Sequence, residues 1–402
     1  MPSRAIVEAE LRSRYSDLLD VDYPCVSDVE MERRATAVAG MMATHGLDAL
    51  IVAEAMRAGT ATGWITGWPV TAEAVTVIVP GVPRRMFIQH YNHLPLARRI
   101  AWHTEVAWGE GSAIGRAAEA VAAATSDAAI MGRATVGVIG RLPAGEAERL
   151  AGRFRVVDMN RAYAQLRMIK SDEEVRWLSL AAGLTDLAVM AFAENARPGT
   201  SERELIARVQ ESYLALGGTN FIHYVHSTGM DAPDVAVPRQ YPSGRVLRTG
   251  DVVSCELSVD YWGWTGQILR TFFLGAEPSP LYRELHAVAD AAMDAVLAQV
   301  KPGAHARDLV EASRGIEEAG FTVIDDLVHG YGGGYLPPVL GTASRPSAGI
   351  PDLTLAAGMA LVVQPNVTTR DGTAGVQTGN LILVTETGWH PLQQFPRGYQ
   401  VL

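Results

Sequence analysis

Two segments in the second half of the chain repeat one pattern. ARPGTSERELIARVQE begins at Ala196, and VKPGAHARDLVEASRG begins at Val300. Each has a Pro-Gly break that ends one helix, and then the start of another helix carrying acidic and basic residues. Strands are expected after both pairs of helices. This rhythm indicates either an internal duplication or a chance recurrence of Pro-Gly helix breaks.

The first 160 residues alternate between helical and extended patterns. Ser27-Asp28-Val29-Glu30 predicts a capping box that opens a helix ending at Gly46. Strands are expected at 47–54, 75–80, 84–89, 135–140 and 155–159, with helices near 112–125 and 144–152. Strands that alternate with helices predict an α/β domain on a mostly parallel or mixed sheet, occupying residues 1–160.

Residues 161–402 are expected to form a second domain. Arg161 to Lys170 is interpreted as a hinge, and capping boxes at 171–174 and 201–204 open two helices. Strands with long loops are expected over 221–276, helices over 281–299 and 305–319, and strands again over 357–389. The whole chain is therefore expected to have an α/β (α+β) fold in two domains.

Composition narrows the functional classes. Apolar residues make up 48% and charged residues 19% of the chain, which allows a large core without disulfides or structural metals. The net charge is −10, and no basic run interleaved with aromatic residues occurs, so nucleic-acid binding is disfavoured. Cys25 and Cys255 are the only cysteines, which excludes a disulfide framework and a thiolate zinc site.

The pattern of apolar residues predicts no targeting or membrane segment. The N-terminal MPSRAIVEAELRSRYSDLL is charged throughout and lacks the apolar core of a secretory signal. No apolar run reaches about 18 residues, so neither a transmembrane helix nor membrane binding is expected. The cytoplasm is the expected compartment.

Six ordered segments carry a family resemblance. They are LRMIKSDEEVRWLSLAAGLTD, ARPGTSERELIARV, GDVVSCELSVDYWGWTGQILRTFFLG, VHGYGGG, GMALVVQPNV and GVQTGNLILVTETGWHPL. In order and spacing they resemble the C-terminal domain of the creatinase/aminopeptidase P family, also called pita-bread hydrolases. The resemblance covers about residue 160 to the C-terminus and is weaker before it.

The resemblance implies a small N-terminal α/β domain and a pseudo-two-fold pita-bread domain, whose helices wrap a curved antiparallel sheet. It also implies a homodimer in which the N-terminal domain of one subunit closes over its neighbour's active site. The family binds two divalent metal ions through two aspartates, a histidine and two glutamates. The corresponding positions here are Glu256, Gln267, His329, Gln364 and Gly379.

This set of side chains is short of negative charge. One carboxylate remains where the family has four, and Gly379 has no side chain to offer. Amide oxygens are neutral and bind divalent cations weakly. We therefore expect no dinuclear site and no metal cofactor, with a single weakly held ion at Glu256 and His329 as the alternative.

Loss of the metal has a precedent in this family. Creatinase hydrolyses a C–N bond of creatine without a metal and uses a histidine and glutamates for proton transfer. The nearest equivalent of that histidine here is Pro233-Asp234, with His223 and His226 earlier in the same segment. The creatinase glutamates fall on Leu269 and Gly379. The resemblance therefore does not imply creatine as the substrate.

The polar residues that remain suit proton transfer. His329 is the expected proton-transfer residue, with Glu256 as its acid–base partner or as an anchor for a substrate cation. Gln267 and Gln364 carry donors and acceptors that would orient a substrate. The alternatives are structural: a buried core histidine at 329, and a glutamate at 256 that points outward or joins a buried ion pair.

Five further residues are weaker substrate-binding candidates: His223, His226, Asp234, Trp264 and Tyr331. His223 and His226 differ by three positions, so they face opposite sides of a strand and at most one is expected in the site. Trp262 and Trp264 are expected to share a strand face, either as a pocket wall or as core packing. Tyr335 is a candidate of the same rank as Tyr331, and Asp234 is either a site residue or the start of a turn.

These observations favour a metal-independent, creatinase-like enzyme. It would act on a C–N bond of a small polar substrate (amide, amidine or urea-like), by hydrolysis rather than by elimination or cyclisation. The first alternative is a non-catalytic ligand-binding protein on the same fold. The second is an Xaa-Pro aminopeptidase-type metallopeptidase with unusual ligands, which the metal content of the purified protein would distinguish.

Overall fold

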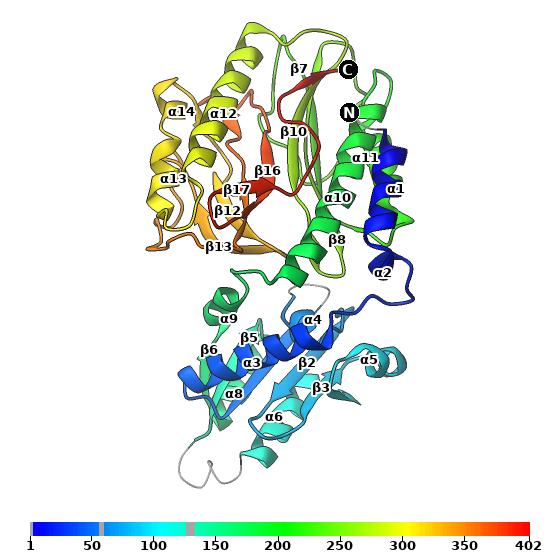
Figure 1. Cartoon of the computed structure of the whole chain (residues 1–402), viewed down its shortest axis with the longest axis vertical. Helices are drawn as coiled ribbons and strands as arrows, with labels where there is room; N and C mark the ends of the chain where they lie inside the picture. The colour runs from blue at the N-terminus through cyan, green and yellow to red at the C-terminus, as the bar shows by residue number, and fades with distance from the viewer. Residues whose placement is uncertain (1–2, 56–59, 126–132) are drawn as a thin grey trace. The chain divides into compact units, whose positions relative to one another are not determined.

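The structure is a computed structural model that describes residues 3–55, 60–125 and 133–402. The chain divides into two compact units, one of residues 21–167 and one of residues 1–20 together with 168–402 (Figure 1). The division therefore falls seven residues after the predicted boundary at 160/161. It also assigns the first twenty residues to the larger unit, which the sequence did not indicate.

The described part of the smaller unit contains a six-stranded sheet in the order β4-β3-β2-β1-β5-β6. Its strands are β1 Ala49–Ala55, β2 Glu73–Ile78, β3 Arg84–Ile88, β4 Thr104–Trp108, β5 Thr135–Gly140 and β6 Arg155–Asp158. The β1–β2 and β2–β3 pairs are antiparallel and the other three pairs are parallel. The prediction of a mixed sheet is confirmed.

Helices cover both faces of this sheet. Helices α6 Ala113–Ala124 and α8 Ala144–Arg153 pack on one face, through a core that includes Ile51. Helices α3 Asp28–Thr44, α4 Ala61–Thr66 and α9 Asn160–Leu166 pack on the other face, through a core that includes Leu50. Because successive residues of a strand point to opposite faces, the apolar run Ala49 to Ala53 of β1 supplies both cores.

In the described residues, the larger unit is built on a ten-stranded sheet, with the main order β13-β12-β14-β16-β10-β8-β7. The strands of this order are β7 Thr219–Gly229, β8 Asp251–Tyr261, β10 Ile268–Phe273, β12 Val328–Tyr331, β13 Tyr335–Leu340, β14 Ala360–Val363 and β16 Gly379–Val384. Strands β9 Trp264–Thr265, β17 Trp389–Pro391 and β18 Gln400–Val401 pair with β8, β16 and β10 respectively.

Two sets of helices accompany the two halves of this sheet (Figure 1). Helices α10 Asp172–Asn195 and α11 Glu202–Leu214 precede the first half, and α12 Pro280–Gln299, α13 Ala306–Ala312 and α14 Gly315–Glu318 precede the second. Both predicted capping boxes are present, at Ser171 with Glu174 and at Ser201 with Glu204. Helices α1 Arg4–Arg14 and α2 Ser16–Leu19 join this unit, with the Tyr261 hydroxyl donating to Leu18 O at 2.6 Å.

The two halves of the larger unit repeat the same backbone contacts. Gly199 N donates to Leu247 O, and Gly303 N donates to Leu355 O, both at 2.9 Å. Both glycines have positive φ, 96° and 88°, a conformation that an L side chain would strain. The predicted repeat therefore corresponds to two structurally equivalent Pro-Gly turns, each of which is hydrogen-bonded to a loop that leads into a later strand, β8 or β14.

Three local predictions need correction. Trp262 does not share a strand face with Trp264, because Trp262 (φ 53°) and Gly263 (φ 84°) form the two-residue turn between β8 and β9. The proposed hinge from Arg161 to Lys170 does contain the division between the two units, but helix α9 occupies its first part. Ser27 does cap α3, but the Glu30 carboxylate bonds Arg33 and Arg34 instead of closing a capping box.

One helix in the described residues, α10, is long and apolar enough to pass a composition test for a membrane span. The 18-residue window of α10 that passes this test is 83% buried inside the protein. Core helices of soluble proteins pass the same test, so α10 is explained as the central helix behind β8 and β10.

Candidate functional site

Four neighbouring strands bring two of the five family ligand positions, Glu256 and Gly379, into one cross-strand row. Tyr224 on β7 lies opposite Glu256 on β8, Glu256 lies opposite Leu269 on β10, and Leu269 lies opposite Gly379 on β16. Directly opposite residues project from the same face of a sheet. The row therefore places the one remaining carboxyl on the same face as Gly379.

Glu256 is a buried carboxyl with one amide partner. Only 6% of the residue is exposed, and Gln267 Nε2 donates a hydrogen bond to Glu256 Oε1 at 2.7 Å. Burial, and after it the negative charge of Asp325, raise the pKa of Glu256 to about 8, against the opposing effect of the Gln267 hydrogen bond. The carboxyl therefore keeps its proton at neutral pH and does not present a full negative charge.

His329 on β12 is fully buried between aromatic rings. Its ring stacks on Tyr335 with 4.0 Å between centroids and 21° between planes, and it meets the Tyr331 ring edge-on at 5.3 Å. Nδ1 lies 3.3 Å from Gly330 O, so it carries the proton and leaves Nε2 as an acceptor without a partner among the described residues. Burial lowers the pKa of His329 to about 4, so the ring is neutral at neutral pH.

Tyr331 and Gln364 connect His329 to the Glu256 row. The Tyr331 hydroxyl donates to Ser258 Oγ at 3.3 Å, and Ser258 follows Glu256 by two positions on β8. Gln364 is fully buried, and its side chain lies near enough to His329 to raise the pKa of the histidine, against the larger effect of burial. In the described residues neither Gln364 polar atom has a hydrogen bond of normal geometry.

A second polar row lies beside the first on the same face. His226 is opposite Ser254, Ser254 Oγ lies 3.1 Å from Thr271 Oγ1, and Thr271 Oγ1 accepts from Gln377 N at 2.8 Å. All four residues are fully buried, and the side-chain nitrogens and oxygen of His226 and Gln377 lack partners in the described chain. Burial lowers the pKa of His226 to about 3, so this row carries no charge at neutral pH.

Eight of the 20 buried side-chain polar atoms that lack a partner in the described residues lie on this face of the sheet. They belong to His226, Gln267, His329, Gln364 and Gln377, and the other twelve belong to residues elsewhere in the chain. Each such buried atom costs about 1–3 kcal/mol unless a ligand, a water molecule or a rearrangement satisfies it. A concentration of them on one face is typical of a binding site and unusual in a core that only packs.

The other predicted site residues lie elsewhere. His223 faces helix α11, where its Nε2 lies 3.0 Å from the Tyr213 hydroxyl, so His226 is the one of the pair on the Glu256 face. Asp234 is an exposed loop residue that accepts from Thr228 Oγ1 at 2.7 Å, in keeping with a turn. Trp264 is buried in the β8–β9 hairpin at 6% exposure.

Three residues near the site were missed or underrated from the sequence. Asp325 acts electrostatically on Glu256, Tyr224 and Tyr335, and burial together with Asp326 raises its own pKa. Tyr224 lies directly opposite Glu256, and Tyr335 covers His329. The signal for Asp325 was a pair of acids just before an apolar strand, whereas Tyr224 depended on a pairing register that the sequence does not reveal.

Comparison with known proteins assigns the family. A model of metallopeptidase family M24 matches residues 176–386, just over half of the chain. The chain belongs to metallopeptidase family M24. It is 34% identical over 196 residues to an uncharacterized hydrolase/peptidase, y4tL, from Sinorhizobium fredii, covering 46% of this chain and 49% of that protein. The match thus spans about half the length of this relative.

Relatives whose names state a specific peptidase activity are more distant. An Xaa-Pro dipeptidase of Pyrococcus horikoshii is 26% identical over 267 residues, which cover 65% of this chain and 73% of that protein. The crystal structure of X-Pro aminopeptidase from Thermotoga maritima superposes with a TM-score of 0.76 at 20% identity, over 92% of this chain and 99% of that one. Xaa-Pro dipeptidase from Bacillus anthracis gives 0.77 at 23%, over 92% and 100%. These likenesses confirm the creatinase/aminopeptidase P fold.

The family name implies a metal centre, and the residues of this M24 protein do not fit one. The single carboxyl holds a proton at neutral pH, and Gln267 turns its amide donor, not its oxygen, toward it. A Cβ on Gly379 would lie 2.7 Å from Leu269 Cδ1 and 2.9 Å from Gln364 Cβ, so a glutamate there has no room. Across the described residues, no group of three or more His, Cys, Asp or Glu side chains is placed to hold a metal ion.

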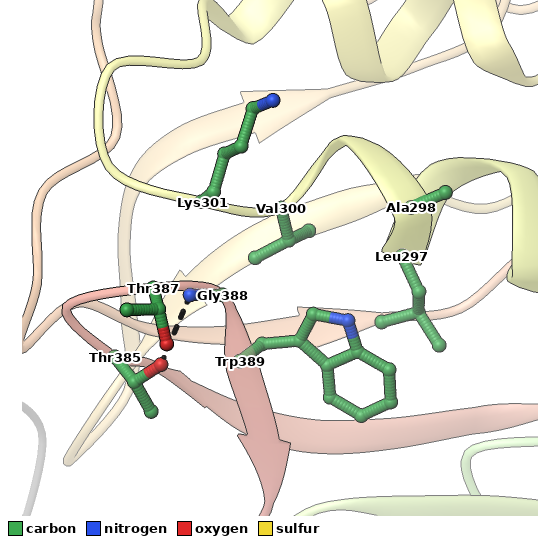
Figure 2. A pocket seen from close by; sticks show the side chains of 8 residues that line it. All are labelled: Leu297, Ala298, Val300, Lys301, Thr385, Thr387, Gly388 and Trp389. Carbon is green, nitrogen blue, oxygen red and sulfur yellow. Dashed lines mark hydrogen bonds between the residues drawn. The ribbon is translucent and has the colours of Figure 1, made fainter.

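A surface hollow of about 500 Å³ lies away from these rows, where the end of α12 meets the turn between β16 and β17 (Figure 2). Leu297 and Val300 line it and belong to the core that contains Ile382. On β16, Ile382 points to the face opposite Gly379. The hollow is therefore separate from the candidate site.

Proposed function

We propose that this M24 protein is a metal-independent hydrolase that cleaves a C–N bond of a small polar substrate. The observation that carries the proposal is that a buried His329 with an unpartnered Nε2 and a buried carboxyl at Glu256 lie on one polar face of a sheet, in a fold shared with peptidases. Peptidases of this fold also cleave C–N bonds, so the reaction class is retained while the metal is replaced by acid–base groups.

The two groups have complementary protonation states. Below about pH 8 Glu256 carries a proton that it can donate to a leaving nitrogen, and above about pH 4 His329 Nε2 is free to accept a proton from water. Water then adds to the carbon as the C–N bond breaks, and the nitrogen leaves with the proton from Glu256. Gln267 and Gln364 would orient the substrate, since an amide offers both a donor and an acceptor.

The pH profile follows from these directions. Activity is expected between about pH 4 and pH 8, since His329 gains a proton below this window and Glu256 loses one above it. A metal-bound hydroxide would give a different profile, because its activity rises as the metal-bound water ionises.

The test is a screen of simple amides, ureas and amidines in the presence of EDTA, with release of ammonia or amine as the readout. Turnover that survives EDTA and is lost in both His329→Ala and Glu256→Gln supports the proposal. Asp234→Asn is the matched control, because Asp234 lies in an exposed loop. Full activity in either site variant, or activity that EDTA removes, overturns the assignment.

The remaining expectations are proposals of the same standing. A homodimer is proposed from the family resemblance, and a cytoplasmic location is a further proposal. The ligand-binding alternative is favoured by one observation, the closure of protein atoms over His329 Nε2. Binding of a substrate analogue without any turnover in the screen would select it.

A further inference from the structure

The candidate site is closed in this structure, and one side chain forms its outer wall. His329 has no exposed surface, and its Nε2 is covered by protein atoms. A substrate that reaches this nitrogen must therefore displace a side chain. Tyr335 is the side chain placed to move, because it stacks directly on the His329 ring while 48% of the residue remains exposed.

The backbone next to Tyr335 is built from glycine. Gly332, Gly333 and Gly334 connect β12 to β13, with φ values of 137°, 79° and 98°. A Cβ on Gly334 would meet no heavy atom within 4 Å, so the residue just before Tyr335 has free space beside it, whereas a Cβ on Gly332 would lie 2.6 Å from Lys170 Cε. The ladder between β12 and β13 also shifts register between His329 and Gly330. Tyr335 thus lies at the end of a loop that can change its dihedral angles at low cost.

The place filled by the Tyr335 ring has a defined shape and charge. Its floor is the flat face of the neutral His329 ring, and its side is Tyr331, whose ring lies 6.2 Å from Tyr335 at 80°. Burial raises the pKa of Tyr335, and the negative charges of Asp325 and Asp326, together with that of Glu256 at a pH high enough to ionise it, raise it further. A flat group fits between such walls, and an anion is disfavoured by the surrounding carboxyls.

We propose that Tyr335 determines substrate specificity by occupying, in the ligand-free chain, the subsite on His329 that a flat, non-anionic group of the substrate takes in its place. The inference rests on the proposed function, because it concerns the His329 face at which that function places the substrate. It adds a substrate class: molecules with a planar uncharged or cationic group, and not those that would put a free carboxylate here. Tyr335 is a positioning residue in this account and takes no part in proton transfer.

The proposal predicts the direction in which removal of the Tyr335 ring changes the binding of a flat probe. If Tyr335 competes with the substrate for one place, Tyr335→Ala tightens the binding of a flat probe, by about three- to tenfold for the loss of one aromatic pair. A ring that merely supported the site would give weaker binding when removed. Tyr335→Phe keeps the ring and leaves binding unchanged, and Tyr241→Ala is the matched control, because that tyrosine is 85% exposed on a loop.

The experiment measures dissociation constants by 19F NMR with 4-fluorobenzamide as the probe, 4-fluorobenzoate as its anionic counterpart and cyclohexanecarboxamide as a competitor that is not flat. Tighter 4-fluorobenzamide binding in Tyr335→Ala alone, with weak binding of the other two compounds, supports the proposal. Unchanged or weaker binding in Tyr335→Ala, or equal binding of 4-fluorobenzoate, overturns it. Turnover is not measured, so these outcomes are independent of whether His329 is catalytic.

A second measurement needs no ligand. Diethyl pyrocarbonate acylates accessible neutral imidazoles, and mass spectrometry locates the modified residue. His329 is expected to be modified faster in Tyr335→Ala than in the parent protein, while the fully buried His226 is expected to stay protected in both. If His329 in Tyr335→Ala is as protected as His226, Tyr335 is not its cover.

Discussion

The proton on Glu256 has a consequence for stability that can be measured without a substrate. An unfolded glutamate loses its proton near pH 4.5, whereas folded Glu256 keeps it to about pH 8. Between these values the folded state binds more protons than the unfolded state, so the free energy of unfolding falls as the pH rises. Glu256→Gln removes the titrating group, keeps the size of the side chain and leaves an oxygen that accepts from Gln267.

The gain in the free energy of unfolding expected for Glu256→Gln grows with pH. Each pH unit between the two pKa values is worth about 1.4 kcal/mol. Glu256→Gln should therefore match the parent protein near pH 4.5, exceed it by about 3 kcal/mol at pH 7, and reach a plateau of about 5 kcal/mol above pH 8. An inactivating substitution would thus stabilise the fold, a trade-off that is common at functional sites.

The assay is urea unfolding at pH 5, 6, 7, 8 and 9, followed by the fluorescence of the buried Trp177 and Trp264 in the larger unit. Asp17→Asn is the control, because its ion pair with Arg176 lowers the pKa of Asp17. Asp17 is ionised in both the folded and the unfolded protein over this pH range. The difference in the free energy of unfolding between Asp17→Asn and the parent protein should therefore be constant. A constant difference for Glu256→Gln as well, or a loss of stability that grows with pH, would refute the reasoning.

Three further predictions concern neighbouring contacts. The double variant Gln267→Asp, Gln364→Glu should bind Mn²⁺ more tightly than the parent protein in calorimetry, because it restores two carboxylates beside Glu256. No Mn²⁺ binding in the double variant would count against the argument that the parent site lacks the negative charge to hold metal ions. Gly266→Ala should cost about 2 kcal/mol or more in unfolding experiments, since its Cβ would lie 2.6 Å from Ala181 O in α10. At pH 4, Asp186→Ala should cost about 1–3 kcal/mol, because it leaves Gln394 N and Phe395 N without the oxygens that accept from them, and an unchanged urea midpoint would show that this anchor of the C-terminal segment is dispensable.

Local patterns were readable from the sequence, and long-range pairings were not. The capping boxes at Ser171 and Ser201 and the repeated Pro-Gly turns depend on neighbours in the chain, and the structure confirms them. The assignment of α1 to the larger unit depends on Leu11 filling the space above Gly183. An amphipathic helix indicates that it has a buried face, but not which element covers that face.

For the candidate site, too, local motifs were readable from the sequence and long-range partners were not. The positions of Glu256, Gln267, His329 and Gln364 followed from ordered motifs. Their partners came from strands whose register is fixed only by the whole sheet: Tyr224 opposite Glu256, and Gln377 behind Thr271. The covering of His329 by Tyr335 could not be predicted from the sequence either. A tyrosine after three glycines indicates a loop, but the sequence does not show which residue the tyrosine ring covers.

The central claim is that a buried proton and neutral amides have replaced a pair of metal ions. The most direct test is to incubate the purified protein with Mn²⁺, Co²⁺ and Zn²⁺ in turn, remove free ions by gel filtration, and count bound metal by plasma mass spectrometry. The account predicts far less than one ion per chain for each metal, because the donor set lacks ionised carboxylates at neutral pH. About two ions per chain, lost on Glu256→Gln or His329→Ala, would contradict it and return the protein to the metal-dependent peptidases.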